Sequence, residues 1–431
     1  MKETGKFGFW SIVLLGINGI VGTGIFLLPN KAYSIIGSAS LGVLLFDAVI
    51  AGCIALCFAE AASLFTRNGG PYLYAKHALG DFWGFEVGVL KWIVTVIAWA
   101  AMAVGFATAL GAAVPALSGD FAKDVISFIL IVGLTIVNIF GVNVSKFVNN
   151  LITISKLVPL ALFIAIGIFF INGANFSPVF PHDTYVEGSF AQAAVLLFFA
   201  YTGFEVIAIA AEDMKNPKKN LPRAIIMCML LVSVLYMAIL AVSIGVLGSD
   251  LANTKAPVQD AFVEMIGPIG APLVSYGALI SIAGLNIGES IMVPRFGAAL
   301  ADEKLLPADL GKTNSKNAPV IAIIISGAFA FLLLLSGSFE SLATFSVVFR
   351  FFQYIPTALA AIKLRKMYPD KKVTFRVPFG PVIPVLAVVI SILMIAGDNM
   401  MNFVWGVVGL AISSGLYFVF HSNKGIKPTK N

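Results

Sequence analysis

Apolar segments long enough to cross a lipid bilayer recur along the whole chain, and this pattern restricts the fold more than any other feature. About 20 apolar residues span a hydrocarbon core about 30 Å thick. Of the 431 residues, 59% are hydrophobic and 12% are charged, whereas charged residues make up about a quarter of a typical soluble domain. We therefore expect an all-α polytopic membrane protein, a single domain over residues 1–431. Its twelve predicted transmembrane helices are 9–32, 38–65, 82–113, 124–141, 147–171, 189–213, 224–247, 270–300, 318–336, 341–364, 381–397 and 402–420.

The basic residues predict the orientation of these helices. If the N-terminus is cytoplasmic, the outer loops hold only Lys31, Lys123 and Lys255, while most other lysines and arginines fall in inner segments. Cytoplasmic loops of membrane proteins are enriched in lysine and arginine. We therefore expect a multi-pass protein of the plasma (cell) membrane with both termini in the cytoplasm. The net charge of +6 follows from this distribution and does not indicate nucleic-acid binding.

Glycine clusters interrupt two of the predicted helices. Gly22, Thr23 and Gly24 lie inside the first, and Thr202 and Gly203 lie in the middle of the sixth. Unwound backbone is tolerated at membrane depth only where protein buries it or where it lines a cavity. Paired interrupted helices of this kind mark the substrate site of many transporters. We predict a site at the two breaks, against the alternative that glycine is simply common in membrane helices.

The five-helix spacing between the breaks predicts an internal repeat. An odd number of helices in each half inverts the second copy in the membrane. We expect the first repeat at about 9–171 and the second at about 189–366. Helices 11 and 12, at about 381–420, would then be peripheral.

The two breaks offer complementary chemistry. The amides that follow Gly22 open a half-helix whose positive dipole end suits a carboxylate. Carbonyls freed between Phe199 and Thr202 suit an ammonium group, so the pair matches an amino acid. Phe199 and Phe204 flank the second break, and we expect them to cover the substrate. Packing against lipid is the competing role for these rings.

Other chemistries lack support in the sequence. The three cysteines and three histidines show no metal-ligand spacing, so we expect no metal and no cofactor. We find no catalytic cluster and expect no enzyme. No glycine run ends in Gly-Lys-Ser/Thr, which excludes a P-loop pump, so transport must draw on ion or substrate gradients.

Several motifs resemble one transporter family. GIVGTGIFLLP in helix 1, RNGGPYLYAKHALG after helix 2 and TGFEVIAIAAEDMKNPKKNLPRAI from helix 6 are similar to segments of the amino acid/polyamine/organocation (APC) superfamily. The likeness covers nearly the whole chain and favours bacterial amino acid permeases with a lysine in helix 5. It implies the LeuT-type fold, a five-plus-five inverted repeat with helices 1 and 6 broken.

The resemblance also implies substrate contacts. The family's carboxylate-binding positions fall on Thr23 and Gly24. Its amino-group contacts fall on the carbonyls of Ile20, Phe199 and Thr202.

Lys156 is an ionisable residue deep inside helix 5. It lies about nine residues, or roughly 13 to 14 Å, from the inner end of that helix. A central lysine costs about 3 kcal/mol to insert, so it is a functional candidate by default. In the proton-dependent branch of the resembled family, a lysine here takes the place of a sodium ion and is proposed to couple protons. The alternative is a fixed ammonium that holds helices together.

Three further charges fall near the predicted site. Glu205 follows the helix 6 break, and we expect it to sense pH or anchor a gate; a backbone-bonded carboxyl, or the partner of a nearby cation, is the alternative. Glu289 in helix 8 and Arg350 in helix 10 depart from the commonest family pattern. We predict a buried ion pair between them. Contact of one of them with a charged substrate side chain is the alternative.

These observations predict a secondary active amino acid transporter that works by alternating access. Proton-coupled symport through Lys156 is the leading interpretation, so protons and the amino acid are the expected partners within the lipid bilayer. An obligatory exchanger (antiporter), with the lysine as a structural substitute for an ion, is the alternative of the same fold. An amino acid sensor is the alternative of another class.

Overall fold

The computed structural model describes residues 8–65, 70–141, 146–209, 214–268, 270–335, 338–369, 375–397 and 399–421. Within these ranges the chain is helical and contains no β-strand. The helices are α1 (Phe9–Ile20), α2 (Thr23–Leu27), α3 (Pro29–Ile36), α4 (Ser40–Leu64), α5 (Pro71–Leu79), α6 (Asp81–Ala113), α7 (Asp120–Ile139), α8 (Lys146–Gly167), α9 (Ser189–Tyr201), α10 (Glu205–Ile209), α11 (Pro217–Leu247), α12 (Pro257–Ile266), α13 (Gly270–Asp302), α14 (Val320–Leu334), α15 (Phe339–Met367), α16 (Val382–Gly397) and α17 (Met400–His421).

Each predicted apolar segment coincides with one helix or with two or three shorter helices in succession. The first becomes α1, α2 and α3, and the sixth becomes α9 and α10. In the described part of the chain, eight helices are long and apolar enough to cross a membrane, and four apolar helices are shorter. The all-helical, multi-pass architecture is thus confirmed, whereas the twelve crossings and the inverted repeat stay predictions.

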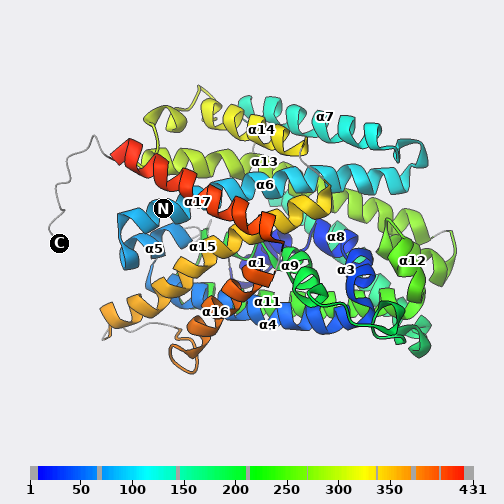
Figure 1. Ribbon diagram of the computed structural model, residues 1–431. Helices are drawn as coiled ribbons and strands as arrows, with labels where there is room; N and C mark the ends of the chain where they lie inside the picture. Colours follow the sequence, from blue (N-terminus) through cyan, green and yellow to red (C-terminus); the bar gives the residue numbers. More distant parts are fainter. Residues whose placement is uncertain are drawn as a thin grey trace.

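Helices from the two predicted repeats pack against each other in pairs. α4 packs against α11, α6 against α13, and α7 against α14. Figure 1 shows α7 and α14 side by side along one edge of the molecule, with α4 and α11 along the opposite edge. These pairs join the second, third and fourth helices of one predicted repeat to their counterparts in the other.

The outward faces of the peripheral helices are apolar. Exposed side chains include Phe128 and Ile129 on α7, Leu332 on α14, and Leu393 on α16. Soluble monomers rarely expose apolar surface of this extent. Lipid therefore covers these faces, and the polar groups of the site are confined to the interior.

An ion pair ties the adjacent ends of α4 and α15. Arg365 donates to both oxygens of Glu60, from Nε at 2.8 Å and from Nη2 at 2.5 Å. The amide of Val377 donates to the same carboxylate at 2.9 Å. Glu60 is 3% exposed, so its charge depends on these donors.

Arg365→Met should lower the free energy of unfolding by about 3 kcal/mol, because it leaves the buried Glu60 carboxylate without its counter-charge. Denaturant titration of the purified protein in micelles measures the loss. Lys366→Met, at the exposed neighbouring position, is the matched control. Equal stability of the two variants would contradict this role for the ion pair.

Candidate functional site

The first break lies where the glycine cluster predicts it. α1 ends at Ile20, Val21 has extended backbone, Gly22 has φ of −152° and ψ of −150°, and α2 starts at Thr23. The first amides of α2 have no carbonyl one turn earlier in the same helix. The Thr23 Oγ1 atom is buried and has no hydrogen-bond partner among the described residues. The break therefore presents amides and a hydroxyl that are able to bind an anionic group.

The second break lies between α9 and α10. Gly203 has φ of +106°, a conformation that L side chains rarely adopt. The amide and the Oγ1 atom of Thr202 both donate to the Phe199 carbonyl, at 3.1 and 2.8 Å. The second break therefore requires glycine at position 203. Thr202 supplies hydrogen bonds to the Phe199 carbonyl at the end of α9.

The two breaks contact each other directly. A Cβ atom on Gly203 would lie 2.2 Å from the Gly19 carbonyl oxygen, and a Cβ on Gly24 would lie 2.9 Å from the Ala200 Cα. Glycine is needed at both places because backbone meets backbone. Ile20, Thr23, Gly24, Phe199 and Thr202 all lie in or beside this contact, so the structure brings the predicted substrate contacts together.

Tyr236 on α11 joins the two breaks, and the sequence analysis did not single it out. Its hydroxyl lies 3.0 Å from the carbonyl oxygens of both Ile20 and Ala200. The residue is fully buried. A lone tyrosine in an apolar helix carries no local signal that it reaches these carbonyls.

Lys156 lies against the first break. Its side chain is fully buried, and Nζ donates to the carbonyls of Asn18 at 2.8 Å and Val21 at 2.7 Å. These carbonyls belong to the C-terminal end of α1, where the helix dipole favours a cation. The lysine therefore holds the end of α1 in place through its ammonium group.

Glu205 lies at the second break and is fully buried. Its Oε2 accepts from the Gly203 amide at 2.9 Å. Its Oε1 accepts from Arg350 Nη1 at 2.7 Å and from the Tyr354 hydroxyl at 2.5 Å. Lys91 Nζ lies 3.8 Å from the same oxygen. Two of the alternatives predicted for Glu205 therefore hold together: its carboxylate accepts from local backbone, and it is the partner of a cation.

The predicted ion pair between Glu289 and Arg350 is wrong, because Arg350 pairs with Glu205 instead. Glu289 forms no ion pair within 4.0 Å with any described residue, although it interacts electrostatically with Lys91 and Arg350. Glu205 is fully buried while Glu289 keeps part of its surface exposed. The carboxylate with less access to solvent has the greater need of a counter-charge.

Lys91, Glu205, Glu289 and Arg350 together form what we call the central charge cluster. They come from α6, α10, α13 and α15. The cluster contains two cations and two carboxylates. Its charges therefore balance without a ligand.

The two predicted aromatic residues have different surroundings. The Phe199 ring lies edge-on to Phe339, with centroids 5.7 Å apart. The Phe204 ring lies among Phe58 and Tyr354, with centroid distances of 5.3 and 5.7 Å. In this conformation Phe204 packs against other aromatic rings.

Apolar side chains cover the first break. A Cβ on Gly22 would lie 2.3 Å from Leu285 Cδ1. Leu285 on α13 packs with Met102 and Ala98 of α6. The sequence analysis did not single out these residues, which form a small apolar cluster beside Gly22.

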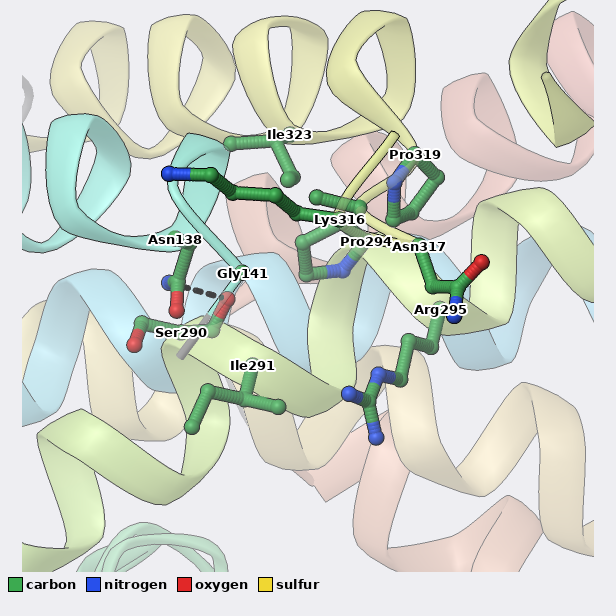
Figure 2. Close-up of a pocket in the computed structure, with 11 residues that line it drawn as sticks. Asn138, Gly141, Ser290, Ile291, Pro294, Arg295, Lys316, Asn317, Pro319 and Ile323 are labelled. Atoms are coloured by element: carbon green, nitrogen blue, oxygen red, sulfur yellow. Dashed lines mark hydrogen bonds between the residues drawn. The ribbon is translucent and has the colours of Figure 1, made fainter. Parts of the chain in front are cut away.

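A small cavity lies beside the end of α7, and Figure 2 shows the residues that line it. Its volume is about 90 Å³. Asn138 donates from Nδ2 to the Ser290 carbonyl at 2.9 Å, and Lys316 and Pro319 approach from the segment before α14. None of the predicted site residues lines it. In the described ranges, no three His, Cys, Asp or Glu side chains are grouped to hold a metal ion.

Comparisons with known proteins match nearly the whole chain. A family model for amino acid permeases matches residues 7–421. An uncharacterized transporter of Mycobacterium tuberculosis (strain ATCC 25618 / H37Rv) is 32% identical over 419 residues, which cover 90% of this chain and 86% of the relative. In Bacillus subtilis, the branched-chain amino acid permease BcaP is 28% identical, covering 96% of this chain and 92% of the relative. The serine/threonine exchanger SteT is also 28% identical, covering 95% and 96%.

A double-mutant cycle distinguishes the observed ion pair from the predicted one. Glu205→Gln and Arg350→Met should show a coupling energy of about 1 to 3 kcal/mol, because residues in direct contact are not additive. Glu289→Gln with Arg350→Met is the matched cycle, and its coupling should be smaller. Denaturant unfolding in micelles measures both cycles. A stronger coupling through Glu289 would refute the assignment.

Proposed function

The chain belongs to the amino acid permease family, and from this premise we propose that it is a secondary active transporter of neutral amino acids in the plasma membrane. Family membership means that the chain is a transporter and not an enzyme. The contact between the two breaks, with Lys156 bound to one of them, is the observation that carries the proposal. We also infer twelve crossings, an inverted repeat and cytoplasmic termini.

The head group of the amino acid binds at the breaks. Its carboxylate accepts hydrogen bonds from the amides near Thr23 and Gly24 and from the Thr23 hydroxyl, which has no other described partner. Its ammonium donates hydrogen bonds to the carbonyls of Ile20, Phe199 and Thr202. Ile20 and Phe199 already accept from protein donors, but a carbonyl oxygen has two lone pairs and accepts a second hydrogen bond.

The substrate side chain is neutral in this proposal. Arg350 already pairs with Glu205, so an acidic side chain would have to displace a buried carboxylate to reach it. Leu285 and Met102 instead give the side-chain region an apolar wall. The relatives named for branched-chain amino acids and for serine and threonine have neutral substrates in their names, which supports the same class.

Proton coupling occurs through Lys156. When charged, its ammonium donates to the two carbonyls at the end of α1. Loss of the proton would remove the charge that the α1 dipole favours and weaken its hold on the break. In this proposal, loss of the proton from Lys156 frees the end of α1, and α1 then moves during alternating access.

An obligatory exchanger is the second candidate. The relative SteT is named an exchanger, and a permanently charged Lys156 would hold α1 equally well. The two candidates differ in their driving force, since only a symporter fills an empty vesicle at the expense of a pH gradient.

Proteoliposomes should take up a radiolabelled neutral amino acid when the outside is more acidic than the inside. Lys156→Ala should reduce this uptake to the level seen without a gradient, because the proton carrier is gone. Lys219→Ala, at an exposed position, is the matched control. Uptake that strictly requires internal amino acid would exclude symport and support exchange, and no uptake in either assay would refute the proposed function.

Leu285→Ala should change substrate selectivity rather than abolish transport. The variant removes side-chain volume beside Gly22, so the ratio of affinities for phenylalanine and valine should rise by about tenfold. Competition against a labelled neutral amino acid measures the ratio. Leu393→Ala, on the lipid-facing side of α16, should leave it unchanged. An unaltered ratio in Leu285→Ala would remove this residue from the side-chain pocket.

A further inference from the structure

A second, larger cavity lies between α6 and α13 and is bordered by α5. Its volume is about 390 Å³, within the range of small-molecule sites. None of its lining residues belongs to either break. It is therefore separate from the substrate contacts proposed above.

Lys91 lies at the inner end of this cavity, which is the end deepest within the protein. Lys91 and Met292 both line it, and each is about ten residues, or roughly 15 Å, from the helix end that carries Asp81 or Asp302. Tyr72 and Glu303 form the opposite rim, where the Tyr72 hydroxyl donates to Glu303 Oε2 at 3.2 Å. With the orientation proposed above, this rim faces the cytoplasm.

The ammonium of Lys91 is held only loosely. Its ion pair with Glu205 is long, at 3.8 Å, because the same oxygen accepts shorter bonds from Arg350 and Tyr354. Lys91 Nζ also lies 5.6 Å from the centroid of the Phe296 ring. An ammonium has three donors, so this group is able to bind a further anion. Arg295 also lines the cavity, as do the carboxylates Asp302 and Glu303 at its rim, so Lys91 is the cation at its inner end.

The walls of the cavity are apolar. Met292, Phe296 and Leu300 line one side. Gly88 on α6 adds no side chain opposite them, and a Cβ there would lie 2.6 Å from Leu300 Cδ2. A cation at the inner end and apolar walls along the cavity complement a small molecule with one anionic end and an apolar body.

We propose that this cavity is a second, cytoplasm-facing site for a small organic carboxylate with an apolar body, bound through Lys91. The orientation rests on the proposed function. Two sources share this chemistry: the neutral amino acid itself and the 2-oxo acid derived from it. A carboxylate at Lys91 competes with Glu205 for the ammonium, so occupancy is transmitted to the helix 6 break through the central charge cluster.

Equilibrium binding to the purified full-length chain in lipid nanodiscs tests the site. Labelled 4-methyl-2-oxopentanoate has no amine for the carbonyls of the breaks, and we expect one molecule to bind per chain in this cavity. Loss of this binding in Lys91→Met distinguishes the cavity from the carboxylate-binding amides near Thr23. Labelled leucine tests the other source. Two leucine molecules bound per chain mean that the cavity also accepts the amino acid. One leucine molecule per chain means that the cavity selects the 2-oxo acid. Isopentylamine, which lacks a carboxylate, should not compete with the 2-oxo acid.

Variants locate the binding. Lys91→Met should weaken 2-oxo acid binding at least tenfold by removing the ammonium, and Gly88→Leu should do the same by filling the cavity. Gly88→Ala should have an intermediate effect, since the nearest atom is the end of a flexible leucine. Gly133→Leu on α7, where a Cβ meets nothing within 4 Å, is the matched control. Size-exclusion chromatography and thermal unfolding confirm that each variant is folded.

The inference fails if the wild type does not bind the 2-oxo acid, or if folded Lys91→Met and Gly88→Ala bind it as the wild type does. Its failure is distinguishable from failure of the proposed function. Normal uptake of a neutral amino acid without 2-oxo acid binding refutes only the second site. Binding of the 2-oxo acid without any amino acid uptake or exchange refutes only the transport proposal.

Discussion

Two unwound stretches of backbone meet in the interior of this membrane protein, and the surrounding side chains are arranged around that contact. Gly19 and Gly203 approach so closely that a single methyl group would not fit. Lipid offers no hydrogen bonds to the freed groups, so protein side chains supply them. Tyr236, Lys156 and Glu205 each bind backbone at a break. They come from three different helices, and the breaks therefore depend on the packing of the whole bundle.

The central charge cluster shows how the interior holds four ionisable groups. Each charge would be expensive alone at membrane depth. Glu205 is shared by Arg350 and Lys91, and Glu289 interacts with both cations from a partly exposed position. Because Glu205 also caps the Gly203 amide, any change in the cluster reaches the second break. The cluster therefore links the charges of four helices to the backbone geometry of the site.

The sequence predicted local features well and contacts between helices poorly. Glycine clusters identify the breaks because the backbone conformation there requires glycine, and Lys156 is conspicuous because a charge is rare in an apolar helix. Depth along a helix can be counted at about 1.5 Å per residue. Rotation and tilt against neighbouring helices cannot be counted in this way. The Glu289–Arg350 pairing was wrong, and Tyr236 was missed, for that reason.

The hydroxyl of Tyr236 lies at equal distance from two carbonyl oxygens, one at each break. A tyrosine hydroxyl carries a single proton, so it satisfies one of these acceptors at a time and leaves the other short of a donor. In the proposed function, an ammonium group at the Ile20 carbonyl would supply a second donor at this joint. The substrate would then help to hold the two broken helices together.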